Sequence, residues 1–213
     1  MNCGLGNLDT LRTYLLQSGF TQPELFDDLL PILGKGVAGA MQRYCNRDFQ
    51  RSTSAVDEFA ADRSYYILRR YPVESITSLE LRETYDGAWT AQTLTDVLTQ
   101  LATYSGLVEF GGQLDLGTTR ARITYTGGYH FETLEPADVG YPTALPSGAT
   151  ALPDDLRLAW LVQCNAWFIK RDKLNLVQLA GASPDAAATV AALAGRDLEP
   201  EVKTMLKPFV RYA

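Results

Sequence analysis

The sequence is poor in the residues on which most catalytic and metal-binding sites depend. It contains a single histidine, His130, which excludes a multi-histidine metal site and any catalytic histidine pair. No G-x-S-x-G nucleophile motif is present. The three cysteines, Cys3, Cys45 and Cys164, are odd in number and widely spaced, which argues against a disulfide framework and a C-x-x-C metal site. We therefore expect no catalytic residues, metal or cofactor, and we expect Cys45 and Cys164 to pack inside helices.

Long apolar runs and clustered positive charge are also missing. No apolar run approaches the ~18 residues of a membrane-spanning helix, so we expect no membrane association. The first residues, MNCGLGNLDTLR, lack the basic and apolar regions of a signal peptide, and we expect the protein to lie in a cytoplasm. The net charge of −6 disfavours binding to DNA by phosphate neutralisation, which requires clustered Lys and Arg.

Two short patterns resemble functional motifs but do not satisfy them. Gly34-Lys35-Gly36 resembles part of a phosphate-binding loop, yet Gly36 occupies the position of the Ser or Thr that would reach Mg²⁺. Carboxylates such as Asp57, Glu58 and Glu109 leave open a small hydrolase, which would need a deep site that raises the pKa of one carboxyl group. Adjacent residues such as Asp57 and Glu58 point apart on a strand, so a solvated strand edge is the simpler interpretation.

Apolar residues at helical spacing predict an N-terminal helix over 8–19, ended by Gly19. A second helix is expected from Thr21 to about Cys45, opened by a capping box in TQPE and kinked or divided at Pro31. A third is expected from Pro153, at its first position, to about Gln178. Its buried face carries large side chains at helical spacing, namely Leu156, Trp160, Cys164, Trp167 and Phe168.

The segment between these helices has the pattern of β-structure. Asp86-Gly87 predicts a hairpin turn, and the slip in the alternation of SITSLELRE predicts a β-bulge. Residues 95–103 fit a helix or a strand equally. The spacing predicts an antiparallel sheet rather than βαβ units, with strands at 64–68, 75–83, 88–94, 104–110 and 120–126. The fold class is therefore α+β: a helical bundle with a β-rich insertion over 51–130, in a single domain of 1–213.

Two further segments have no place in the core pattern. Residues 131–152 form a long proline-containing surface loop, and long ordered loops are often functional. Residues 198–213 predict a short helix from Pro200 that stops at Pro208, with Lys207 extended before it. The FVRYA end then predicts an extended apolar and basic tail. Such a tail either folds back on its own core or docks on a partner, and we expect the partner.

The order of these elements resembles the head–tail connector (adaptor) proteins of long-tailed bacteriophages. The resemblance rests on RYCNRDF at the end of the second helix, RRYPVESITSLEL and ITYTGGY in the β-region, the helix from LPDDL to KRD, and LKPFVRY at the C-terminus. It implies a structural virion protein of the neck. The family forms a ring, usually dodecameric, between the portal and a stopper or tail-completion protein, and DNA passes through the lumen. It also implies that the C-terminal segment binds the portal, through Met205, Leu206, Pro208, Phe209, Arg211 and Tyr212.

Two alternatives stay open at this stage. A stopper or tail terminator would have a similar architecture, and its position in a particle would distinguish it from a connector. The carboxylate-dependent hydrolase comes from a different functional class and is the less favoured alternative.

Overall fold

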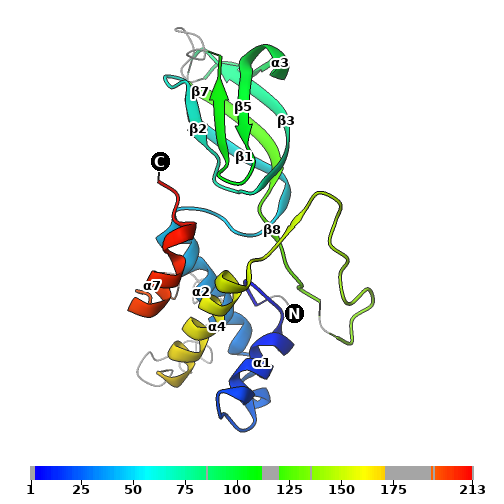
Figure 1. Cartoon of the computed structure of the whole chain (residues 1–213), viewed down its shortest axis with the longest axis vertical. Helices are drawn as coiled ribbons and strands as arrows, with labels where there is room; N and C mark the ends of the chain where they lie inside the picture. Colours follow the sequence, from blue (N-terminus) through cyan, green and yellow to red (C-terminus); the bar gives the residue numbers. More distant parts are fainter. Residues whose placement is uncertain are drawn as a thin grey trace. The chain divides into compact units, whose positions relative to one another are not determined.

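The computed structural model describes residues 3–84, 86–111, 120–134, 136–170, 193 and 195–212. The chain forms two compact units (Figure 1). The helical unit comprises Met1–Asn46, Phe131–Leu145 and Ala151–Val210, and the β-unit comprises Arg47–His130, Pro146–Thr150 and Arg211–Ala213. The β-rich segment predicted over 51–130 lies within the continuous part of the β-unit. The fold is α+β, as predicted.

The first helix, α1 (Leu8–Gln17), begins at Asn7, whose side chain accepts a hydrogen bond of 2.9 Å from the backbone N–H of Thr10. It ends at Gln17, two residues before Gly19, which adopts a left-handed φ of 92°. The predicted apolar face is confirmed, because Leu8, Leu11 and Leu15 are buried.

The predicted second helix is divided into two pieces. A 3-10 turn, η1 (Pro23–Phe26), precedes α2 (Leu30–Cys45), and Pro31 lies in the first turn of α2, where its missing N–H costs nothing. The predicted capping box is wrong: Gln22 is the N-cap of η1, and it makes no side-chain capping bond in its left-handed conformation of φ 66°. Asn46 ends α2 in the left-handed conformation, with φ 50°.

Helix α4 (Asp154–Ile169) supplies the large side chains of the helical core. All five predicted core residues of this helix are buried: Leu156, Trp160, Cys164, Trp167 and Phe168. Pro153 is the N-cap rather than the first helical residue. The predicted continuation to Gln178 lies outside the described residues after Lys170. The indole Nε1 of Trp160 donates a hydrogen bond of 3.0 Å to the carbonyl of Gly34, which joins α4 to α2.

The β-unit consists of two antiparallel sheets and a short pair of strands. In the larger sheet the strand order is β1-β7-β3-β4, formed by β1 (Ser52–Ala60), β7 (Arg120–Gly127), β3 (Val73–Arg82) and β4 (Thr90–Gln92). The smaller sheet has the order β2-β6-β5, formed by β2 (Tyr65–Ile67), β6 (Leu107–Phe110) and β5 (Leu98–Ala102). A helical turn, α3 (Leu94–Val97), precedes β5, and β8 (Tyr129–His130) pairs with β9 (Thr150–Ala151).

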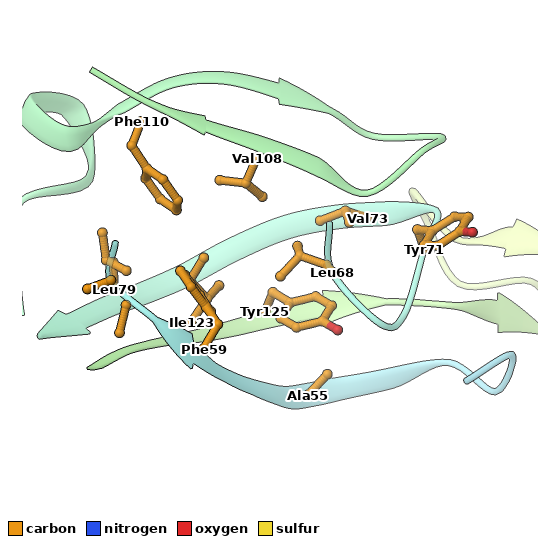
Figure 2. Close-up of a cluster of buried hydrophobic side chains, with 12 residues drawn as sticks. Ala55, Phe59, Leu68, Tyr71, Val73, Leu79, Val108, Phe110, Ile123 and Tyr125 are labelled. Carbon is orange, nitrogen blue, oxygen red and sulfur yellow. The ribbon is translucent and has the colours of Figure 1, made fainter. Parts of the chain in front are cut away.

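The core of the β-unit lies between the two larger sheets. Figure 2 shows Val108 and Phe110 of β6 facing Phe59, Leu79 and other buried side chains of the four-stranded sheet. The predicted hairpin at Asp86-Gly87 is confirmed, because β3 and β4 pair on either side of it. The predicted bulge is confirmed by register shifts in β3 against β7. The undecided segment 95–103 contains both the end of α3 and strand β5.

Strand β1 is absent from the predicted strands. Its buried positions are Ala55, Asp57 and Phe59, whereas Val56 and Glu58 are exposed. A carboxylate occupies an inward position and a β-branched apolar residue an outward one. These two positions reverse the usual alternation and weaken the sequence signal.

The loop predicted over 131–152 is organised by one carboxylate. Glu132 accepts hydrogen bonds from the backbone N–H groups of Thr133 (2.9 Å) and Leu134 (2.7 Å), and from both the N–H and the hydroxyl of Thr143. The carbonyl of Leu134 in turn accepts a hydrogen bond from Asn7 Nδ2. Burial by itself would raise the pKa of Glu132, but these hydrogen bonds outweigh it and lower that pKa.

Candidate docking site at the C-terminal segment

The C-terminal segment begins as a helix that packs within the helical unit. As predicted, α7 (Pro200–Leu206) starts at Pro200, and Glu199 is its N-cap. The backbone N–H of Glu199 donates a hydrogen bond of 2.9 Å to Oε1 of the buried Gln163. An ion pair of 2.6 Å joins the Glu199 carboxylate to Lys170 Nζ. Val202 and Leu206 are fully buried, so this helix is part of the core.

The end of α7 differs from the prediction. The chain continues into the 3-10 turn η2 (Lys207–Phe209), and Lys207 is helical, with φ −49° and ψ −43°, rather than extended. Pro208 lies in the first turn of η2, where a proline needs no backbone donor, so it tightens the helix end instead of straightening it. The chain becomes extended only at Val210.

The structure places the six predicted portal-binding residues in different environments. Leu206 is buried in the helical unit, and its carbonyl lies 3.9 Å from the thiol of Cys45. Met205 and Phe209 are half-buried, Pro208 is exposed, and Tyr212 is 78% exposed. Arg211, by contrast, is only 9% exposed and belongs to the β-unit. Among these six residues, the available surface therefore consists of Pro208 and Tyr212, with parts of Met205 and Phe209.

Arg211 occupies a site built by β1 and β2, which we call the Arg211 site. Its Nε and Nη2 atoms donate hydrogen bonds of 2.9 Å and 2.5 Å to the carbonyl of Ile67. Its guanidinium carbon lies 5.4 Å from the centre of the Tyr66 ring, and Tyr66 and Arg211 interact electrostatically. Asp57, which is 5% exposed, supplies the negative charge of the site.

The Asp57 carboxylate of the Arg211 site is removed from water and interacts with Arg69 and Arg211. Burial raises the pKa of Asp57, and the N–H of Arg69 and the charges of Arg211 and Arg69 oppose that rise. Burial also raises the pKa of Tyr66, and the nearby Asp57 adds to this effect. The pKa of Tyr125, whose hydroxyl accepts a hydrogen bond of 3.0 Å from the N–H of Arg70, is raised for the same two reasons. The combination of a carbonyl, a carboxylate and a phenol is suited to a guanidinium.

Sequence reasoning predicted Arg211 only as a portal-binding residue, and it missed Asp57, Tyr66 and Ile67 as partners of Arg211 within the chain. Asp57 was considered only as an exposed or hydrolytic carboxylate. A signal was available, because Asp57 alternates with Ala55 and Phe59 along one strand. That spacing would have placed Asp57 on the inward face.

The carboxylates proposed for a hydrolase do not converge. Asp57 points into the β-unit, while Glu58 lies on the opposite face of β1 and is within 3.9 Å of Arg120. Glu109 lies on β6, opposite Tyr65. Across the described parts of the chain, His, Cys, Asp and Glu side chains form no group of three that could hold a metal ion. Within the same parts, no helix has the length and hydropathy needed to span a membrane.

Comparison with known proteins identifies the fold. No protein-family model matches the sequence, and no curated protein matches it. Among solved structures, the chain is similar to one described as "Neck of empty GTA particle computed with C6 symmetry", with a TM-score of 0.54 and 19% identity over 96% of this chain and 88% of that chain. A second similar structure, "Neck of native GTA particle computed with C12 symmetry", has a TM-score of 0.48 and 18% identity over 87% of this chain and 82% of that chain. The first likeness shows that this chain has the fold of a neck protein.

Proposed function

We propose that this protein is a structural component of the neck of a phage-like particle. Copies of the chain form a ring of twelve subunits between the portal and a stopper or tail-completion protein. The observation that carries this proposal is the likeness, over 96% of the chain, to a protein from the neck of a GTA (phage-like gene transfer agent) particle. That neck was computed with C6 symmetry, which fits a closed ring of identical subunits joined head to tail.

The composition agrees with a passage for DNA rather than a DNA-binding protein. A net charge of −6 gives the subunit no excess of cations for phosphate neutralisation. DNA would therefore pass through the lumen without specific binding. The protein would be made in the host cytoplasm and then reside at the head–tail junction.

The portal contact is proposed on the C-terminal segment, through Met205, Leu206, Pro208, Phe209, Arg211 and Tyr212. Pro208 and Tyr212 are the exposed members and would make the first contact. A stopper or terminator role is the alternative within the same fold. No geometry of the described residues favours the hydrolase, since Asp57 and Glu58 lie on opposite faces of β1.

Localisation in the particle tests the proposal. Removal of the gene should yield DNA-filled heads without tails, and cryo-electron microscopy of wild-type particles should place a ring of this chain directly under the portal. A position at the distal end of the neck would support the stopper or terminator instead. Absence of the chain from the particle would refute a neck role.

Binding to purified portal tests the docking segment. Deletion of residues 208–213 should abolish binding, and Tyr212→Ala should weaken it while leaving Arg211 in place. The matched control is Tyr104→Ala, because Tyr104 is 81% exposed and belongs to the β-unit away from the segment in sequence. Wild-type binding by the deletion variant would refute the assignment of this segment.

A further inference from the structure

One residue of the proposed docking segment is already bound within its own chain. Tyr212 is 78% exposed, but its neighbour Arg211 is 9% exposed. Arginine is rarely buried unless it is paired, because desolvation of the charge is costly. The burial of Arg211 therefore indicates a specific site.

The Arg211 site satisfies a guanidinium in three ways. The Ile67 carbonyl accepts from both Nε and Nη2, at 2.9 Å and 2.5 Å. Tyr66 contributes a ring face, whose centre lies 5.4 Å from the guanidinium carbon. Asp57 contributes charge, while its Oδ2 is fixed by a 2.7 Å hydrogen bond from the N–H of Arg69. Only a planar, forked cation can use the carbonyl and the ring together, so lysine would not substitute for arginine.

The site is also built independently of its occupant. The Tyr66 ring is stacked on Phe59, with ring centres 4.1 Å apart and planes inclined by 10°. Asp57 and Ile67 belong to strands that are paired with β7 and β6. Release of Arg211 would therefore leave the acceptors in place.

We propose that Asp57, Tyr66 and Ile67 form an intramolecular guanidinium site that stores Arg211 in the free subunit and competes with the portal for it. The proposal rests on the portal-binding role proposed above. The exposed Pro208 and Tyr212 are available at once, whereas Arg211 becomes available only after it leaves the site. Full engagement of the C-terminal segment would thus follow first contact with the portal.

The site itself can be tested without any portal. In the full-length protein, exchange of the Arg211 Nε–H with water, measured by NMR and assigned through Arg211→Lys, should be at least tenfold slower than that of the exposed Arg63. Tyr66→Phe removes the polar hydroxyl that interacts electrostatically with Arg211 but keeps the ring on Phe59, and it should speed this exchange roughly five- to tenfold. Equal exchange rates for Arg211 and Arg63 in the wild type would overturn the site.

Competition is tested with purified portal. Tyr66→Phe leaves the C-terminal segment unchanged. Because Arg211 would be held less tightly in the Arg211 site, the affinity of the protein for portal should rise, by up to roughly five- to tenfold. Tyr65→Phe, at an exposed neighbouring position, is the matched control and should bind as the wild type does. If Tyr66→Phe releases Arg211 but leaves portal affinity unchanged or lower, competition is refuted while the neck role stands. If the wild type does not bind portal at all, the docking role fails, and the exchange measurement still decides the site.

Discussion

The carboxylate of Asp57 accepts a 2.7 Å hydrogen bond from the backbone N–H of Arg69, across the interior of the β-unit. This bond holds the segment after β2 beside β1, although the two strands belong to different sheets. The same arrangement removes the Asp57 carboxylate from water, which disfavours its charged form. This desolvation is the largest cause of the raised pKa of Asp57.

Asp57→Asn should change the pH dependence of stability. A raised pKa in the folded state means that the folded protein binds more protons than the unfolded chain above about pH 4, the ordinary range for Asp. The stability that Asp57 contributes is therefore fully present below about pH 4, and it is lost as the pH rises through the pKa of Asp57 in the folded protein. The raised pKa values of Tyr66 and Tyr125 keep both tyrosines neutral in this range.

Urea unfolding at a series of pH values from 4 to 7 measures this effect. The wild type should lose stability relative to Asp57→Asn as the pH rises. Glu58→Gln, at the adjacent outward position, should leave the slope unchanged. A wild-type protein that gains stability over Asp57→Asn with rising pH would show that the carboxylate is stabilised by its partners more than burial destabilises it.

The features that sequence predicts well are those with local causes. Helix α4 was predicted because large apolar residues such as Trp160 and Phe168 recur at helical spacing, and all of them are buried. Strand β1 was missed because burial of Asp57 depends on Arg69 and Tyr125, which are distant in sequence. The burial of Arg211 depends on Ile67, 144 positions away, so no local pattern could assign it to its own chain rather than to a partner.

Arg47→Lys should destabilise the β-unit. Arg47 is 2% exposed, its guanidinium carbon lies 3.3 Å from the centre of the Tyr71 ring, and Nη2 donates to the Tyr71 carbonyl. Rings of Phe49 and Tyr129 lie 5.2 Å and 5.4 Å away. Lysine lacks the planar group that stacks on Tyr71, so a loss of about 1–3 kcal/mol is expected.

Fluorescence of Trp89, the one tryptophan of the β-unit, reports this unfolding in a variant whose two helical-unit tryptophans are replaced by Phe. Arg63→Lys in the same background is the control, because Arg63 is exposed. An Arg47→Lys protein as stable as this control would mean that a positive charge at position 47 is sufficient to stabilise the β-unit, without stacking on Tyr71.

Gly34→Ala should destabilise the helical unit. A Cβ atom at Gly34 would lie too close to the carbonyl oxygen of Cys3 and 3.1 Å from the Trp160 ring. The backbone at Gly34 or Cys3 would therefore have to move. The movement would also disturb the 3.0 Å bond from Trp160 to the Gly34 carbonyl. A loss of about 1–3 kcal/mol or more is expected despite the better helix propensity of alanine.

Urea unfolding followed by Trp160 fluorescence measures this loss. Lys35→Ala, at the next and exposed position of α2, provides the comparison and should unfold like the wild type. Equal stability of Gly34→Ala and Lys35→Ala would show that α2 and α4 separate at little cost.

Glu132→Ala should loosen the loop over 131–145 without unfolding the helices. The carboxylate joins Leu134 and Thr143 through hydrogen bonds from both. Amide exchange at these positions, followed by mass spectrometry, should therefore become faster, while exchange in α4 stays unchanged. Val139→Ala is the control, since Val139 is fully exposed in the same loop.

The pH dependence gives a second test of the same carboxylate. Because hydrogen bonds lower the pKa of Glu132 in the folded protein, the order they confer is present above the ordinary pKa of about 4.3 and is lost as pH falls through the folded value. The wild-type loop should thus stay protected at pH 5, and the difference from Glu132→Ala should be as large there as at pH 7. Loss of wild-type protection between pH 7 and pH 5 would mean that burial, and not hydrogen bonding, controls this group.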